Sequence, residues 1–133
     1  MEKTKKYQIS SSVNDGILEI ILTDEFVASD LEELQNEVAD IIEAKEAKNV
    51  LVDVRAFNGR ASIIETYTSV RRPLPIRLKV NAAIVDLPEN VDIASFLETT
   101  AQNANRSLKC FTDIDAARDW LKSKISRVNT DNL

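Results

Sequence analysis

Residues 50–65, "VLVDVRAFNGRASIIE", contain the transition that decides the fold. An apolar run ends at Val54, a polar loop with the second of only two glycines follows, and a helical pattern begins at Ser62. A buried strand that leads through a short loop into a helix is typical of an α/β fold. The loop also raises a functional question, because it could be a phosphate cradle, a phosphorylation switch or only a turn.

Before this stretch, the sequence predicts a hairpin. Residues 7–11 alternate in polarity as a short strand does, and Asn14, Asp15 and Gly16 tolerate the positive φ angles of a tight turn. Residues 17–22 then form an apolar run that is interrupted only by Glu19. Such a run favours a strand that is covered on both faces.

A helix is predicted next, from Ser29 to near Ala47. Ser29 and Glu32 have the spacing of a capping box, in which each side chain accepts a backbone N–H of the other residue. The apolar residues recur at helical spacing and form one stripe: Leu31, Leu34, Val38, Ile41 and Ile42.

The elements after residue 54 alternate between helices and strands. Helices are predicted over residues 62–72, 91–105 and 112–125, and strands over residues 79–85 and 107–111. Pro73 and Pro75 end the first of these helices, and Thr112 with Asp115 is expected to cap the last.

The resulting order is β-β-α-β-α-β-α-β-α. It predicts a mixed, mostly parallel five-stranded sheet with four helices, in a single domain of residues 1–125. Residues 126–133 are predicted to form a disordered tail.

In such a sheet, ligands and partners meet the loops beyond the carboxyl ends of the parallel strands. Three loops qualify, over residues 23–30, 55–62 and 86–92. The central loop supplies the candidate residues for partner binding or a phosphorylation switch: Asn58, Gly59, Arg60 and Ser62. The other two loops supply the candidate rim residues: Asp24, Ser29, Asp86 and Glu89.

Two residues near this loop each admit two interpretations. The start of a helix attracts anions, so a phosphate could lie there, on a ligand or on Ser62 itself, with Arg60 adding a positive charge. Ser62 and Glu65 also have the spacing of a capping box, and a purely structural role for Ser62 is the interpretation we favour. Asp53 lies within an apolar strand, and we favour a basic neighbour over a functional role for its carboxylate.

Composition excludes several classes of function. The net charge of −5 argues against nonspecific binding of nucleic acid or anionic membranes. The chain contains no histidine and one cysteine, Cys110, so Ser–His and Cys–His nucleophiles and the commonest zinc ligand sets are excluded. No signal peptide, membrane span, dinucleotide motif or Walker loop is found, so we predict a cytoplasmic protein with no enzymatic activity, no cofactor and no metal.

The central strand with its loop, "NVLVDVRAF", and the terminal "FTDIDAARDWL" resemble the SpoIIAA-like branch of the STAS superfamily. The resemblance covers residues 7–125 and implies a bacterial regulatory module that works by protein–protein contact. In anti-sigma-factor antagonists of this kind, a serine in a D-S-S-G-like sequence at the start of the second helix is phosphorylated. Here the corresponding place reads "GRASII", in which Ser62 is the only hydroxyl and the flanking aspartate and glycine are replaced.

The resemblance therefore implies a protein partner, either an anti-sigma factor or a kinase-like regulator. A second prediction follows because SpoIIAA-like domains resemble the lipid-binding CRAL-TRIO fold, which makes a small apolar ligand or lipid the alternative. A homodimer is compatible with both functions, although the sequence does not locate its interface.

Overall fold

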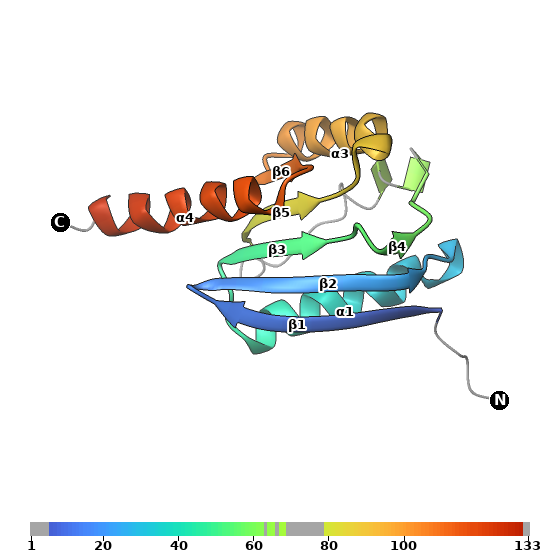
Figure 1. Ribbon diagram of the computed structural model, residues 1–133, viewed down its shortest axis with the longest axis horizontal. Helices are drawn as coiled ribbons and strands as arrows, with labels where there is room; N and C mark the ends of the chain where they lie inside the picture. Colours follow the sequence, from blue (N-terminus) through green and yellow to red (C-terminus); the bar gives the residue numbers. More distant parts are fainter. Residues whose placement is uncertain (1–5, 63, 66, 69–78, 132–133) are drawn as a thin grey trace.

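A sheet of strand order β1-β2-β3-β5-β6 forms the centre of the computed structural model, which describes residues 6–131 except 63, 66 and 69–78 (Figure 1). Beyond Ile125, only the backbone is described. The strands are β1 (Tyr7–Asn14), β2 (Ile17–Glu25), β3 (Asn49–Asp53), β4 (Phe57–Asn58), β5 (Asn81–Val85) and β6 (Leu108–Phe111). The helices are η1 (Ala28–Asp30), α1 (Leu31–Ala44), η3 (Pro88–Asn90), α3 (Val91–Asn103) and α4 (Ile114–Asp131).

The sheet is mixed and mostly parallel, as the sequence predicts. β2, β3, β5 and β6 run in one direction, and β1 pairs antiparallel with β2. The β1–β2 hairpin closes through Asp15 and Gly16, whose φ angles of 53° and 79° are both positive. Two positive φ angles are what a two-residue type I′ turn requires, so the predicted turn is confirmed.

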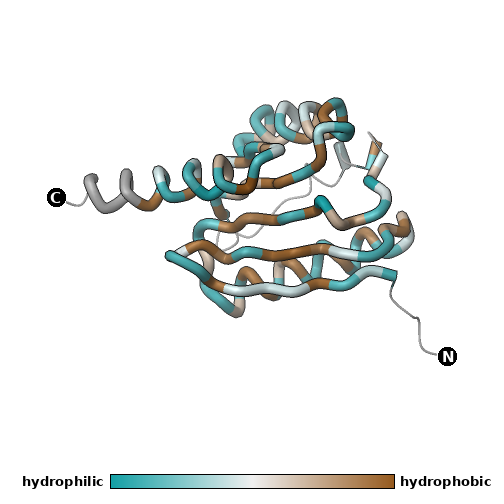
Figure 2. Tube along the Cα trace, in the orientation of Figure 1, coloured by the Kyte–Doolittle hydropathy of each residue, from teal (hydrophilic) through white to brown (hydrophobic). Residues whose placement is uncertain are grey.

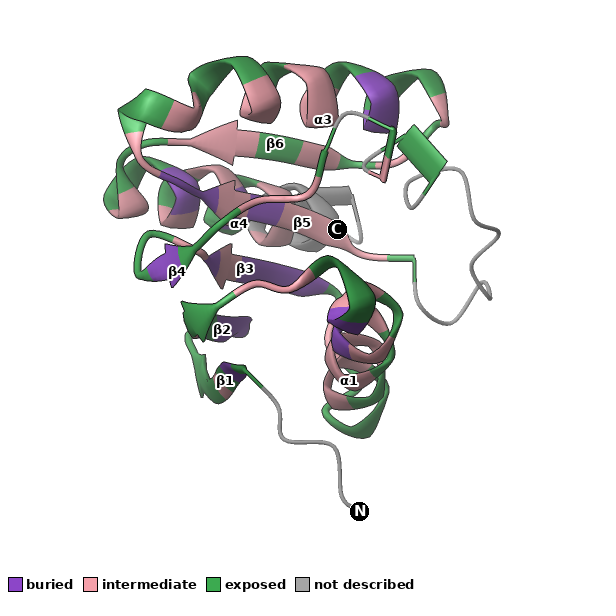
Figure 3. Cartoon of the chain, turned by 90° about the vertical axis from the view of Figure 1, so that its right-hand side faces the viewer, coloured by how far each residue is buried: buried purple, intermediate pink, exposed green. Residues whose placement is uncertain are grey.

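One face of the sheet packs against α1. Its buried residues come from the first strands and from Leu34 of α1, and the complete cluster is Tyr7, Leu18, Ile20, Leu22, Leu34, Val50 and Phe57. Figure 3 shows α1 on one side of the strands, with the buried positions facing inward. This face forms because the alternate residues of β2 and β3 are apolar, which Figure 2 shows as brown bands along both strands.

The other face of the sheet packs against α4. Ile17 and Leu51, the neighbours of Leu18 and Val50, point to this side, where Ala117 and Leu121 of α4 are fully buried. Trp120 lies at the border of this cluster, with its ring centroid 5.9 Å from that of Phe111. The α1 side of β2 and β3 is therefore buried, whereas α4 covers only part of the other side, where Ile21 of β2 is 41% exposed. The prediction that β2 is covered on both faces is thus only partly confirmed.

Several predicted elements differ from those in the structure. The described residues show three α-helices with complete bounds and six strands, where four helices and five strands were predicted. The additional strand is β4, which pairs parallel with the end of β2. Of the predicted helix over 62–72, residues 64, 65, 67 and 68 are helical, and most of the remainder lies outside the described residues.

Two predicted helix caps are wrong. Ser29 lies in the 3₁₀ turn η1, and α1 begins at Leu31 with Asp30 at its N-cap and no side-chain capping bond, so the predicted Ser29–Glu32 box does not form. At the start of α4, the amide of Asp115 donates to Asp113 Oδ1 over 3.1 Å, so Asp113 takes the capping role that was assigned to Thr112. The domain limit at residue 125 and the disordered tail remain predictions.

Candidate functional site

Three loops meet at the edge of the sheet where β2, β3 and β5 end, on the right in Figure 1. We call this edge the rim; it comprises residues 23–30, 55–62 and 86–92. The first two loops are joined by the β2–β4 pairing, which sets Asp24 opposite Phe57, and by a 2.7 Å bond from the Phe26 amide to the Asn58 carbonyl. The central loop is therefore held by backbone hydrogen bonds on one side.

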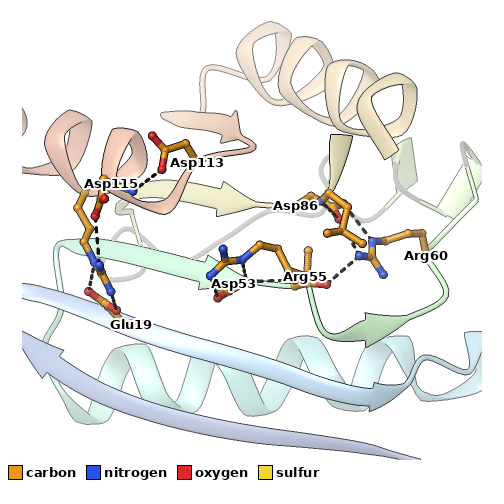
Figure 4. A network of polar contacts seen from close by, with 10 residues as sticks. Glu19, Asp53, Arg55, Arg60, Asp86, Asp113 and Asp115 are labelled. Carbon is orange, nitrogen blue, oxygen red and sulfur yellow. Dashed lines mark hydrogen bonds and ion pairs between the residues drawn. The ribbon is translucent and has the colours of Figure 1, made fainter. Parts of the chain in front are cut away.

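Arg60 fixes the other side of the central loop. Its guanidinium donates to Asp86 in a bidentate pair, with Nη2 2.7 Å from Oδ1 and Nε 3.0 Å from Oδ2 (Figure 4). It also donates to the carbonyls of Val54, Phe57 and Gly59. Arg60 thus connects the end of β3 with the end of β5, and its donors are directed into the protein.

Asp86 is the second half of this connection. Its Oδ1 also accepts the Leu87 amide at 2.7 Å and the Asn90 side-chain amide at 3.0 Å. Burial alone would raise the pKa of Asp86, but the hydrogen bonds from Arg60, Leu87 and Asn90 together lower it. A charged carboxylate therefore sets the position of the turn that leads into α3.

Gly59 allows the central loop to turn sharply. Its φ angle is +92°, a conformation that residues with a Cβ rarely adopt, and an added Cβ would lie 3.4 Å from the Cβ and carbonyl oxygen of Phe26. Asn58, beside it, is exposed. The glycine in the sequence therefore marks a turn, while the neighbouring side chain faces solvent.

Ser62 begins the helical residues after this loop. Its amide donates to Glu65 Oε1 at 2.8 Å, and the Glu65 amide donates to Ser62 Oγ at 3.1 Å. This reciprocal pair confirms the predicted capping box. Ser62 remains exposed, so its hydroxyl is accessible to solvent as well as engaged in the cap.

The structure places the remaining predicted rim residues in different surroundings. Asp24, at φ 70°, and Ser29 are exposed on the first loop, and Glu89 is exposed in η3. Asp86 is buried instead. The rim thus brings Asn58, Gly59, Arg60 and Asp86 into one connected unit, whereas the three exposed side chains surround it.

A second set of ion pairs lies on the face of the sheet that α4 partly covers (Figure 4). Arg55 donates to both oxygens of Asp53, at 3.0 and 2.8 Å, and Arg118 of α4 donates to both oxygens of Glu19, at 2.9 Å each. The hydrogen bonds from Arg55 lower the pKa of Asp53. The interpretation that Asp53 has a basic neighbour is therefore confirmed. Glu19, the one charged residue in the apolar run of β2, forms an ion pair with Arg118 of α4.

Cys110 is a neutral thiol. Burial raises its pKa to about 12, with a further contribution from the nearby carboxylate of Glu98. A thiol with such a pKa contains almost no thiolate at neutral pH and is a poor nucleophile.

The sequence analysis did not identify the apolar side chains that are exposed near the rim. Ile64 is 78% exposed and Tyr67 50%, just after Ser62, and Val91 at the start of α3 is 53% exposed. The i, i+3 spacing of Ile64 and Tyr67, which puts both on one helix face, was the available signal. The spacing shows that the two residues share a helix face, but it does not show whether another part of the chain packs against that face.

No protein-family model and no curated protein matches the sequence. The architecture does match solved structures. An anti-sigma factor antagonist from Mycobacterium paratuberculosis has a TM-score of 0.60 at 12% identity, over 87% of this chain and 94% of the other. An uncharacterized protein with a SpoIIAA-like fold from Shewanella loihica has a TM-score of 0.54 at 16% identity, over 91% of this chain and 98% of the other. This chain has a SpoIIAA-like fold.

The SpoIIAA-like fold confirms the architecture that the sequence resemblance implied. Within the described residues, no group of three or more cysteine and acidic side chains could hold a metal ion. Across the same ranges, no helix has both the length and the apolar composition needed to cross a bilayer.

Proposed function

We propose that this chain is a noncatalytic regulatory module that binds a protein partner through the rim and the helix start beside it. The observation that carries the proposal is the exposure of Ile64 and Tyr67 immediately after the loop that Arg60 fixes. Single exposed apolar residues are common on protein surfaces, but a group of them beside a rigid loop favours a contact surface.

Rigidity of the loop supports this proposal. Because the Arg60–Asp86 pair and the β2–β4 hydrogen bonds hold the loop, little conformational entropy remains to be lost when a partner binds. Val91 follows the turn that Asp86 and Asn90 organise, so it lies on the rim. The fold is shared with an anti-sigma factor antagonist, which makes another regulatory protein the partner class that we propose.

Ser62, besides the capping role that we favour, would give this surface a means of control when it is phosphorylated. A kinase that transfers the γ-phosphoryl group of a nucleoside triphosphate to Ser62 Oγ, with release of the nucleoside diphosphate and the hydroxyl proton, would add nearly two negative charges beside Glu65. Glu65 Oε1 lies 2.8 Å from the Ser62 amide. The helix N-terminus favours the phosphate, while the two anions repel each other, so Glu65 would leave the cap. This exchange would rearrange the backbone next to Ile64 and change partner binding.

The test is affinity capture from a lysate of the native host, with the immobilised chain as bait and mass spectrometry as readout. Ile64→Asp should lose the partner, because it puts a charge beside Tyr67 on the same exposed helix face. Ser123→Asp is the control, since Ser123 is exposed on α4, outside both the rim and the β1 edge. Equal recovery by both variants would contradict the proposed surface.

Ser62→Ala and Ser62→Asp separate the switch from the surface. The switch predicts that Ser62→Asp, which adds a negative charge and keeps a capping oxygen, changes recovery of the partner. A change with Ser62→Ala alone would be an effect of the lost cap. Identical recovery for both and for the wild type would remove Ser62 from the mechanism without affecting the proposed surface.

The apolar-ligand alternative remains a prediction from the sequence resemblance, and a lipid-sized adduct in native mass spectrometry would favour it.

A further inference from the structure

The two edges of the sheet differ in their protection against strand pairing. At the β6 edge, the amide of Cys110 donates to Glu98 of α3 at 3.0 Å, and Lys109 is exposed. Side chains that occupy edge amides and exposed lysines both hinder the addition of another strand. The β6 edge is therefore blocked.

The β1 edge has no such protection. β1 is eight residues long, "YQISSSVN", and contains no charge, proline or glycine. In the described part of the chain, its only strand partner is β2, and residues 10–14 are all exposed. Long, neutral, exposed edge strands are the ones that pair with another chain.

The register of the hairpin shows which backbone groups are open. The Glu25 amide donates to the Lys6 carbonyl, so this is a hydrogen-bonded pair of the antiparallel ladder. Because such pairs alternate along the ladder, the even-numbered residues of β1 bond to β2. The N–H and C=O groups of Ile9, Ser11 and Val13 consequently point away from the sheet.

We propose that β1 pairs antiparallel with β1 of a second copy of this chain, about a twofold axis at Ser11. This register sets Ile9 opposite Val13 of the second copy and Ser10 opposite Ser12, so that two apolar residues meet and two hydroxyl residues meet. It also brings Lys6 near Asp15 of the second copy at both ends, and both residues are exposed. The strand is therefore self-complementary in polarity and in charge.

The pairing extends the sheet across two subunits and covers Val13, which is 54% exposed in one chain. Each odd-numbered pair exchanges two N–H···O=C bonds, and cross-strand β-branched pairs such as Ile9–Val13 add to these. The rim lies outside this contact, so the dimer does not depend on the proposed function.

The test is sedimentation velocity of the full chain from about 10 µM to about 1 mM, since interfaces of this small class bind weakly. The wild type should show a reversible dimer. Ser11→Pro removes the outward N–H without touching the β1–β2 ladder, and Val13→Lys puts a charge at the pair with Ile9. Each should raise the dimer dissociation constant at least about tenfold.

The matched controls are Ser11→Thr, which keeps the amide, and Ser123→Lys, which adds the same charge at an exposed position of α4 away from the edge. Both should dimerise like the wild type, and thermal unfolding should show all four variants folded. If the wild type stays monomeric at every concentration, the proposal is overturned. This outcome is expected if β1 instead pairs with a strand of another protein. Equal dimerisation by the wild type and all four variants, which would place the interface elsewhere, also overturns it.

Discussion

Arg60 and Arg55 form the same bidentate contact with an aspartate but differ in their access to water. The side chains of Arg60 and Asp86 are 14% and 8% exposed, whereas Arg55 is 39% exposed. An ion pair near the surface contributes little to stability, because water solvates the separated charges almost as well. Loss of one partner from a buried pair leaves the other charge without compensation.

Arg60→Ala is therefore expected to lower the free energy of unfolding by about 3 kcal/mol, since it removes the partner of buried Asp86 and the donor to three carbonyls. Arg55→Ala is the matched comparison and should cost less, about 1–2 kcal/mol, because Arg55 is 39% exposed and does not hold the three carbonyls that Arg60 does, although its loss also leaves the buried Asp53 without its donor. Urea denaturation of both variants measures the difference. Equal losses would show that Arg60 does not hold the rim together.

At the scale of elements, apolar patterns predicted more than polar ones did. The apolar runs and stripes located α1, α3, α4 and all but one of the described strands, because burial determines them directly. β4 was missed since two residues, Phe57 and Asn58, are too short for any pattern. The Ser29 cap failed because the chain forms a 3₁₀ turn before α1, which the capping spacing cannot indicate.

The site was harder to predict than the elements, because most of its contacts join residues that are far apart in the sequence. Ser62 and Glu65 are three residues apart, so their capping box could be identified from spacing. Arg60 and Asp86 are 26 residues apart, and Glu19 and Arg118 are 99 apart, so only the folded chain brings these pairs together. The sequence placed Arg60 at the rim and suggested that its positive charge could bind a phosphate. In the structure, the guanidinium N–H groups instead donate to Asp86 and to backbone carbonyls of the chain itself.

The docking of α4 can be tested through Glu19 and Arg118. Arg118→Leu should destabilise the protein by about 1–2 kcal/mol, because it leaves the buried Glu19 carboxylate without its donors, although Arg118 itself is partly exposed. The double variant with Glu19→Leu should recover most of this loss, since two apolar residues need no ion pair.

A double-mutant cycle by urea denaturation measures the coupling, with Asp115→Ala as control. Asp115 lies 3.5 Å from Arg118 but is 81% exposed, so its removal should have little effect. A double variant less stable than Arg118→Leu alone would show that this ion pair is not what joins α4 to β2.

At the scale of the whole molecule, two apolar clusters share one sheet. The α1 cluster uses Leu18 and Val50, and the α4 cluster uses their neighbours Ile17 and Leu51. β2 and β3 each contribute side chains to both clusters, so neither face can lose its packing without exposing the strands that support the other. Chains of this size usually unfold in a single cooperative step, and the shared strands supply the physical reason here.

The single tryptophan makes this cooperativity measurable, because Trp120 reports on the α4 face while Leu34 lies in the α1 cluster. Leu34→Ala should lower the free energy of unfolding by about 2–4 kcal/mol through the cavity it leaves under α1. In urea, the Trp120 fluorescence transition and the far-UV circular dichroism transition should move to the same lower midpoint. If the fluorescence midpoint stayed at the wild-type value while the dichroism midpoint fell, the α1 face would unfold independently, and β2 and β3 would not couple the two faces.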